Sequence, residues 1–221
     1  MKKIVVFDFD GTITTGISHY IYCAHIIADS LEPPYADAFL EEVNNSFNGK
    51  IPFIGEEGWD LLNRISRKYS DRNLFEHSFH QTRRHMLLNI NKGDLSEDVI
   101  SLLKDVHSLC TTALASNSPE EYVKGYLDKL DLEKHFDYVR FSAKKPEGLI
   151  DLVFSISGRM DPADLKVLSV GDHYVNDIQP ALMMKWDTAF INPFHLDRRG
   201  STVSGQSITE LSEWIVSWCK M

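Results

Sequence analysis

Short apolar runs, each followed by polar or turn-forming residues, recur along the chain. The first run covers residues 4–7 and consists of one Ile, two Val and one Phe, with no polar residue between them. A run of four to eight such residues is typical of a strand, and the lack of alternation favours a strand that is buried on both faces of a sheet. Further strand-like runs, rich in apolar residues, predict strands over residues 111–115, 138–142, 166–170 and 188–191.

The stretches between these runs have the apolar spacing of helices. The predicted helices cover residues 96–109, 118–130, 146–156, 177–184 and 208–219. Ser96 and Ser118 are suitable N-cap residues, and Pro119 suits the first helical position. Strands that alternate with helices predict a parallel sheet with helices on both faces. The expected fold class is therefore α/β, with a doubly wound, Rossmann-like core.

The segment from residue 14 to residue 91 lacks strand-like runs and is expected to be entirely helical. Its four predicted helices cover residues 17–31, 36–47, 56–69 and 72–88. The expected domains are a core made of residues 1–13 and 92–221 and a helical domain made of residues 14–91. Because the insertion follows directly after the first strand, we expect it to lie over the end of that strand as a cap or lid.

Composition and charge exclude several classes of protein. The 221 residues are 43% hydrophobic and carry a net charge of −9, which argues against a nucleic-acid partner because phosphate binding needs clustered Lys and Arg. No apolar run approaches the roughly 18 residues of a membrane span, and the first run is too short for a signal peptide. Cys23, Cys110 and Cys219 are widely scattered, which favours reduced thiols in a cytoplasmic protein.

Polar side chains stand at the carboxyl end of four predicted strands. In a doubly wound sheet these ends converge on one crevice, where ligands bind. One such coincidence is common, whereas four in one chain indicate a site. The residues concerned are Asp8 and Asp10 after the first strand, Ser116 and Asn117 after the second, Lys144 and Lys145 after the third, and Asp172 and Asp177 after the fourth.

The charges at these strand ends indicate the ligand. Two unit charges 4 Å apart repel by about 4 kcal/mol at an effective dielectric near 20, and one lysine does not compensate four carboxylates. Either some carboxylates hold protons or a divalent cation lies among them. An all-oxygen set of ligands favours Mg²⁺, which commonly binds one or two carboxylates together with a phosphate oxygen. We therefore expect a magnesium cofactor and a small phosphorylated metabolite as substrate.

Four segments of the chain together resemble the motifs of the haloacid dehalogenase (HAD) superfamily. They are residues 8–12 (DFDGT), 116–117 (SN), 145–146 (KP) and 171–177 (GDHYVND), in the order of the family and at similar spacings. The resemblance covers essentially the whole predicted sheet domain, and the helical insertion is similar to the type-1 cap of this superfamily. Each motif alone has little specificity, whereas the ordered set is specific.

The resemblance implies catalytic roles for three residues. Asp8 would be the nucleophile that attacks phosphorus and forms an aspartyl-phosphate. Asp10 would protonate the leaving oxygen and then accept a proton from the attacking water, which is worth roughly 10²–10⁴ in rate. Lys145 would neutralise Asp8 and the phosphoryl group. Because relatives that cleave carbon–halogen bonds lack an Asp at the second position, Asp10 indicates phosphate esters as substrates.

The remaining members of the motifs would bind metal and phosphate. Asp172 would contact Mg²⁺ directly, with Asp177 beside it or acting through water, and Asp8 and the backbone carbonyl of Asp10 would complete the metal site. The expected substrate-binding residues, which would hold phosphoryl oxygens through side chains and backbone amides, are Thr12, Ser116, Asn117 and Lys145.

The chain departs from the pattern of the superfamily at a few positions. His173 stands where Ser is frequent, and it is either a turn residue or a contact to the metal surroundings or the substrate. Lys144 is an alternative to Lys145, although Lys145 is the lysine that adjoins Pro146, as the motif requires. Candidates for substrate recognition in the helical segment are Lys50 and the cluster of His80, Arg83, Arg84 and His85, although the pattern of the cluster favours a solvated helix face.

The leading interpretation is a magnesium-dependent phosphatase with an aspartyl-phosphate intermediate. A phosphomutase would use the same intermediate and is the nearest alternative among enzymes. A phospho-accepting signalling domain also gathers Asp, Ser or Thr and Lys around Mg²⁺, but such domains are about half this length and order their acidic residues differently. A catalytically silent binding protein is disfavoured by the full set of polar residues.

Overall fold

Two units make up the chain in the computed structural model, which describes residues 2–91, 95–158, 164–198 and 200–221. One unit combines Met1–Thr15 with Asn91–Met221, and the other consists of Gly16–Ile90. The first unit contains all the strands of the described residues, whereas the second contains only helices and loops. Each unit has its own hydrophobic core, so each is described by itself.

A six-stranded sheet forms the centre of the first unit, and all its strand pairs are parallel. The strands, in the spatial order β3-β2-β1-β4-β5-β6, are β1 Lys2–Phe7, β2 Thr111–Ala115, β3 Tyr138–Arg140, β4 Leu165–Gly171, β5 Asp187–Ile191 and β6 Val203–Gly205. The predicted α/β class and the five predicted strands are confirmed. The edge strand β6 was not predicted, because three residues with a central serine give no apolar run.

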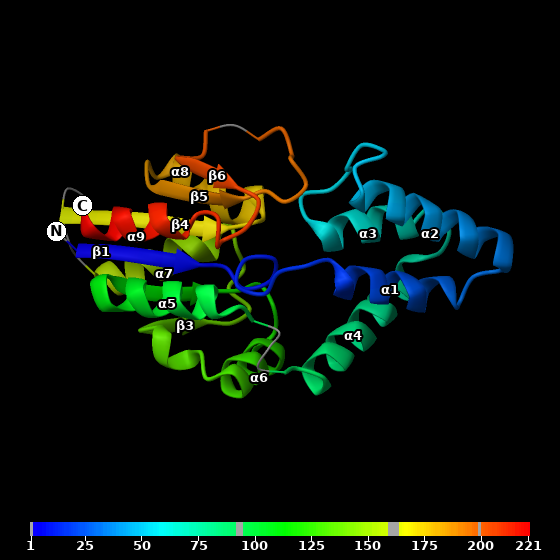
Figure 1. Cartoon of the computed structure of the whole chain (residues 1–221), viewed down its shortest axis with the longest axis horizontal. Helices are drawn as coiled ribbons and strands as arrows, with labels where there is room; N and C mark the ends of the chain where they lie inside the picture. Colours follow the sequence, from blue (N-terminus) through cyan, green and yellow to red (C-terminus); the bar gives the residue numbers. More distant parts are fainter. Residues whose placement is uncertain (1, 92–94, 159–163, 199) are drawn as a thin grey trace. The chain divides into compact units, whose positions relative to one another are not determined.

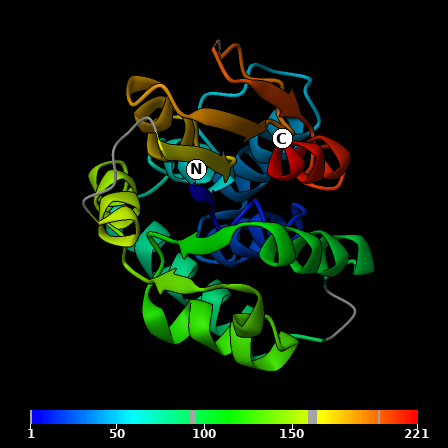
Figure 2. The same ribbon diagram turned by 90° about the vertical axis from the view of Figure 1, so that its left-hand side faces the viewer.

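Helices cover both faces of this sheet (Figure 2): α7 and α8 lie on one side, and α5 and α9 pack together on the other. The helices of this unit are α5 Glu97–Leu109, α6 Glu120–Leu130, α7 Glu147–Ser157, α8 Gln179–Met183 and α9 Ser212–Lys220, with a 3-10 turn at Glu133–His135 and a π-helical turn at Tyr174–Ile178. Ser96 caps α5 as predicted, since its side chain accepts a hydrogen bond from the amide of Val99.

Alternate residues of the central strands point to opposite faces of the sheet. Ile4 and Val6 of β1 therefore lie on the face that packs against α7, where they belong to a buried apolar cluster. The cluster consists of Ile4, Val6, Ala113, Ala115, Ala143, Leu149, Leu152, Val153, Ile156 and Val167. Burial of both strand faces explains the uninterrupted apolar runs in the sequence, and it fixes the strand ends that carry the polar residues.

The carboxyl ends of the central strands lie on the side of the sheet away from the chain termini (Figure 1). The ammonium group of Lys3, near the start of β1, donates a hydrogen bond of 2.7 Å to the backbone carbonyl of Cys219, close to the C-terminus. Strand β1 pairs with β4 from Lys2↔Leu165 to Phe7↔Val170, and with β2 from Ile4↔Thr111 to Phe7↔Leu114. This register brings the ends of β1 and β4 to the same level.

The second unit consists of four helices: α1 Ser18–Ala28, α2 Pro33–Phe47, α3 Gly58–Ser66 and α4 Arg72–Leu88. The four helices predicted for this segment are present, although α1 and α3 are shorter than expected. Helix α3 starts late because the Glu57 carboxylate accepts hydrogen bonds from the amides of Trp59 and Asp60 and so caps it. In the described part of the chain, every helix is too short or too polar to cross a bilayer.

Several aromatic side chains pack against one another in the core of the helical unit. Tyr20 is buried and stacks on Phe47, while its edge contacts the ring of Trp59. Phe53, in the loop before α3, packs against the same core. Trp59 and Phe53 are therefore packing residues of this unit.

Candidate active site

Strand β1 positions the first carboxylate. The amide of Asp8 donates a 2.9 Å hydrogen bond to the carbonyl of Val170, which continues the β1–β4 ladder to the end of the strand. The chain then turns at Gly11, whose φ of +76° favours glycine. A Cβ at this position would lie 2.0 Å from Oδ2 of Asp172. Only glycine therefore allows the loop to come this close to the Asp172 carboxylate.

Strand β4 and the turn after it position two more carboxylates. Asp172 follows the last residue of β4, and Asp177 lies in the π-helical turn. A Cβ on Gly171 would lie 2.4 Å from Cγ of Asp177, so glycine is needed here to let that side chain turn back towards the sheet. The hydroxyl of Ser169 donates to the carbonyl of Asp177 at 2.8 Å and anchors the turn.

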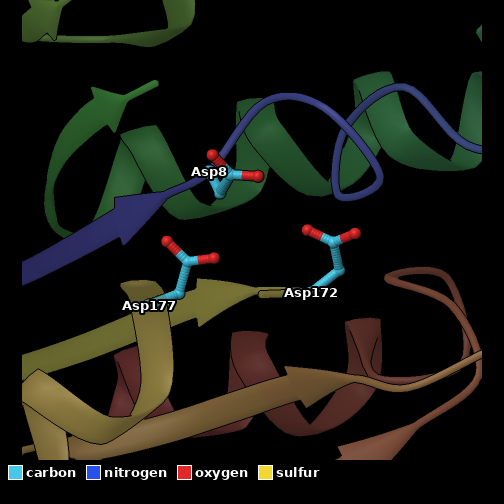
Figure 3. A group of neighbouring side chains, drawn as sticks. All are labelled: Asp8, Asp172 and Asp177. Carbon is cyan, nitrogen blue, oxygen red and sulfur yellow. The ribbon is translucent and has the colours of Figure 1, made fainter. Parts of the chain in front are cut away.

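The carboxylates of Asp8, Asp172 and Asp177 converge on one small space (Figure 3). One oxygen from each side chain lies within 4.8 Å of the corresponding oxygens of the other two, and all three residues are buried. Three buried carboxylate oxygens at this separation fit the all-oxygen ligand set that Mg²⁺ prefers. The chemistry of the donors therefore fits a hard divalent cation.

The ammonium group of Lys145 lies against two of these carboxylates. Its Nζ is 2.5 Å from Oδ1 of Asp8 and 2.6 Å from Oδ1 of Asp177, and the side chain is buried. The side chain of Asn117 holds the backbone at this point, because its Oδ1 accepts from the amide of Lys145 at 2.7 Å and its Nδ2 donates to the carbonyl. Lys144 is exposed, so the structure places only the second of the two adjacent lysines beside Asp8.

Burial and charge shift the pKa values of the groups in this cluster. Burial raises the pKa of Asp8 to about 7, although the ammonium group of Lys145 acts in the opposite direction. Burial also raises the pKa of Asp177. For Lys145, burial alone would lower the pKa, but the nearby carboxylates of Asp177 and Asp8 raise it above its ordinary range. The lysine is thus firmly charged, and it lies against two of the three buried acidic groups, Asp8 and Asp177.

The carboxylate of Asp10 is held by Ser118, a residue that was expected to cap a helix. Its Oδ2 accepts a 2.5 Å hydrogen bond from the hydroxyl of Ser118. The prediction that Ser118 caps a helix was wrong: α6 begins after Pro119, and no side chain caps it. The Ser118 hydroxyl faces Asp10 instead, and only the proximity of Ser118 to Ser116 in the sequence could have suggested this position in the site.

The expected phosphate-binding residues surround the same strand ends. Thr12 is buried, and its hydroxyl lies 3.4 Å from Oδ2 of Asp8. Ser116 follows β2 and is also buried, and its hydroxyl oxygen accepts from the amide of Ser118 at 3.0 Å. A hydroxyl that accepts in this way keeps its own hydrogen for donation. The amide group of Asn117, by contrast, is engaged with the backbone of Lys145.

His173 shapes the turn that carries Asp177. Its Nδ1 accepts from the amide of Asn176 at 3.3 Å, and its own amide donates to Oδ2 of Asp177 at 3.1 Å. Two roles were expected for His173, and the structure shows that of a turn residue. Because its backbone donates to a carboxylate of the cluster, His173 also orients Asp177.

With this geometry established, the class of the protein follows from comparison with known proteins. The sequence matches the family of haloacid dehalogenase-like hydrolases over residues 2–182, which is most of the chain. The protein therefore belongs to this family, as its motifs predicted. No curated protein matches the sequence.

Solved structures share the fold along the whole chain. YfnB from Bacillus subtilis, named as a HAD hydrolase and bound to magnesium, is 15% identical with a TM-score of 0.66, and the match covers 97% of this chain and 98% of that one. A β-phosphoglucomutase from Clostridium difficile is 20% identical with a TM-score of 0.60, covering 100% and 98%. A 2-haloacid dehalogenase from Pseudomonas syringae is 16% identical with a TM-score of 0.54, covering 99% and 100%. These likenesses concern the fold alone.

Proposed function

We propose that this protein is a Mg²⁺-dependent phosphatase that hydrolyses a small phosphorylated metabolite through an aspartyl-phosphate. The observation that carries the proposal is the contact of a buried lysine with Asp8, inside a group of three buried carboxylates. A cluster of carboxylates is suited to a cation, and the positive charges of Lys145 and of that cation would then hold a phosphoryl group by electrostatic attraction.

Asp8 is the proposed nucleophile. Its carboxylate is fixed by Lys145 on one oxygen, and the hydroxyl of Thr12 lies near the other. An oriented carboxylate can attack phosphorus and split a difficult hydrolysis into two easier steps. The ammonium group of Lys145 then offsets the negative charge that gathers on the phosphoryl oxygens during transfer.

Asp10 is the proposed general acid and base. In the first step its carboxyl group would give a proton to the leaving oxygen, and in the second it would take a proton from the water that attacks the aspartyl-phosphate. A halide leaving group needs no proton. An acidic residue at this position therefore supports phosphate esters rather than haloacids as substrates, although the fold is shared with a dehalogenase.

Asp8, Asp172 and Asp177 are the proposed side-chain ligands of Mg²⁺, with the backbone carbonyl of Asp10 as a further contact. When bound, the ion would supply positive charge beside the phosphoryl oxygens and offset the carboxylates around it. The proposed phosphate site consists of Ser116, Thr12, Lys145 and the backbone amide of Asn117. The magnesium bound to YfnB supports this cofactor for the fold.

The helical unit is the proposed cap, and we retain the division into a core of residues 1–13 with 92–221 and a cap of residues 14–91. Its place in the sequence shortly after Asp10 supports this role. A cap that opens and closes controls access of water and substrate in many enzymes. Recognition of the organic part of the substrate would then fall to the cap.

The experiment is an assay of phosphate release. We expect the purified protein to hydrolyse p-nitrophenyl phosphate with Mg²⁺ and to stop when EDTA is added, and a panel of phosphorylated metabolites would identify the substrate. Full activity in EDTA would contradict the metal assignment. A hexose 1-phosphate separates the alternatives: a phosphatase releases inorganic phosphate, whereas a phosphomutase forms the 6-phosphate.

A further inference from the structure

We infer that Ser118 is a positioning residue that orients the carboxyl group of Asp10 for proton transfer to the leaving group. The inference rests on the proposed function and deepens it. Its basis is the 2.5 Å hydrogen bond between the Ser118 hydroxyl and Oδ2 of Asp10, which joins two segments 108 residues apart in the sequence. Ser118 would not touch the substrate and would act through Asp10.

The backbone of Ser118 is held from two sides. Its amide donates to the hydroxyl oxygen of Ser116 at 3.0 Å, and its carbonyl accepts from the amide of Ser142 at 2.9 Å. Pro119 follows and restricts the chain further. The residue is also buried, so its hydroxyl projects from a fixed point of the protein rather than from a mobile loop.

A fixed donor matters because Asp10 lies in a loop after β1 and is only half-buried. A carboxyl group on a flexible bond can turn its oxygens away from the substrate, and a misplaced catalytic group loses much of its effect. A hydrogen bond from Ser118 to one oxygen defines the plane of the carboxyl group. It thereby limits the directions in which Asp10 presents its proton.

Ser118 also links this acid to the proposed phosphate site. Its amide hydrogen goes to Ser116, which would hold a phosphoryl oxygen, and its hydroxyl hydrogen goes to Asp10, which would serve the leaving oxygen. The two oxygens to be recognised are both bound to the same phosphorus. Ser118 thus fixes the spacing between Ser116 and Asp10, the two residues that would contact these oxygens.

The two functions can be separated by substitution. Ser118→Ala removes the hydroxyl donor to Asp10 but keeps the backbone amide that donates to Ser116. Ser118→Thr keeps both donors. Ser116→Ala instead removes a proposed phosphate ligand and one of the two hydrogen bonds that hold the Ser118 backbone, while it keeps the Ser118 hydroxyl that donates to Asp10. Ser157→Ala is the matched control, because Ser157 is buried to a similar degree and, among the described residues, its hydroxyl donates within its own helix, to the carbonyl of Phe154.

The experiment compares two substrates that differ only in the leaving group, phenyl phosphate and p-nitrophenyl phosphate. Phenolate is the stronger base and needs the proton from Asp10 more than p-nitrophenolate does. We expect Ser118→Ala to lower kcat/KM for phenyl phosphate roughly tenfold or more, and for p-nitrophenyl phosphate less than about threefold. Ser118→Thr should restore most of the loss, and Ser157→Ala should change neither substrate.

Ser116→Ala supplies the contrasting pattern, because both substrates carry the same phosphoryl group. It should lower kcat/KM for both by a similar factor. If Ser118→Ala also affected both substrates equally, or neither, Ser118 would not act through Asp10, and the phosphatase assignment would still stand. If the unaltered protein hydrolysed neither substrate with Mg²⁺, the proposed function would fail and this inference with it.

Circular dichroism and thermal unfolding of each variant exclude loss of the fold as the cause. Should Ser118→Ala unfold, Ser118→Cys keeps the size of the side chain with a weaker donor. It should show the same preference for the better leaving group, to a smaller extent. Equal activity of Ser118→Cys on both substrates relative to the unaltered protein would overturn the inference.

Discussion

Two polar clusters lie at opposite edges of the same sheet, and they differ in burial and in the number of acidic groups that they bring together. At the carboxyl edge, Asp8, Asp172 and Asp177 lie together, and the ammonium group of Lys145 contacts Asp8 and Asp177. At the amino edge, Thr112 is buried and its amide donates to Oδ2 of Asp137 at 2.8 Å.

The amino-edge cluster is satisfied by its own members. The Thr112 hydroxyl lies 2.9 Å from the carbonyl of His135 and 3.0 Å from Nδ1 of His107, and the carboxylate of Asp137 is partly exposed to water. Such a cluster stabilises the fold and needs nothing further. The carboxyl-edge cluster places three buried carboxylic groups with oxygens within 4.8 Å of one another, which costs free energy in the folded protein and favours the binding of a cation. The difference indicates which edge serves function.

The largest expected effect is the loss of activity in Asp8→Asn. The amide is nearly isosteric but is a poor nucleophile, so turnover of p-nitrophenyl phosphate should fall by roughly 10⁴-fold or more while the protein still folds. Thr112→Val at the other edge is the control and should keep activity within about twofold. Substantial turnover by Asp8→Asn would remove Asp8 from the nucleophile role.

Lys145→Met should be the most destabilising change. It removes the cation that contacts the buried acidic groups of Asp8 and Asp177, and breaking a buried pair on one side costs about 3–5 kcal/mol of unfolding free energy. Urea unfolding in EDTA measures this loss, and Mg²⁺ should recover part of it. Lys144→Met tests the specificity of the effect, because the neighbouring lysine is exposed and should be replaceable without measurable change.

Mg²⁺ should stabilise the protein through the carboxyl edge alone. A ligand that binds only the folded state at 100 times its Kd adds about 2.7 kcal/mol to the free energy of unfolding. Thermal unfolding with Mg²⁺ and with EDTA should therefore differ by several degrees, and Asp172→Asn should abolish the difference. An undiminished shift in that variant would mean that the ion binds elsewhere.

Asp8→Asn should also change the pH dependence of stability. Burial raises the pKa of Asp8 to about 7, so the folded protein binds the proton more tightly than the unfolded chain and loses stability as the pH rises through that value. In EDTA the variant should be more stable than the unaltered protein by roughly 1–3 kcal/mol at pH 8. The gain should vanish below about pH 4, where Asp8 is protonated in both states.

The smallest expected effect belongs to the amino edge. Thr112→Val removes a hydroxyl but leaves the backbone amide bonded to Asp137, so the free energy of unfolding should fall by about 1 kcal/mol. Urea unfolding measures the change, which should not depend on Mg²⁺. A magnesium-dependent difference would show that the two edges are coupled and would weaken the comparison.

The sequence predicted those parts of the fold that depend on local patterns. Runs rich in apolar residues identified five strands, because burial of the central strands leaves a visible signature, and Ser96 gave the start of α5. Strand β6 carries too few apolar residues to be recognised. The start of α3 could not be predicted from the sequence either, because it depends on capping by the Glu57 side chain.

For the candidate site, the sequence identified the strand ends but not every partner. Asp8, Asp172 and Asp177 could be listed from their positions, and the place of Lys145 before Pro146 favoured it over Lys144, whereas the contact between Lys145 and Asp8 is seen only in the fold. Ser118 was missed because a serine before a proline is a common start of a helix. Its contact with Asp10 links distant segments, and no local pattern contains it.

The central claim is that Asp8 accepts the phosphoryl group within this cluster. The most direct test is Asp10→Asn incubated with p-nitrophenyl phosphate and Mg²⁺, then quenched in acid and analysed by peptide mass spectrometry. A good leaving group needs little acid catalysis, but without a base the intermediate should hydrolyse slowly and accumulate. We predict one phosphoryl group on Asp8, absent when EDTA is present. A phosphoryl group on any other residue, or continued fast turnover with none attached, would contradict the account.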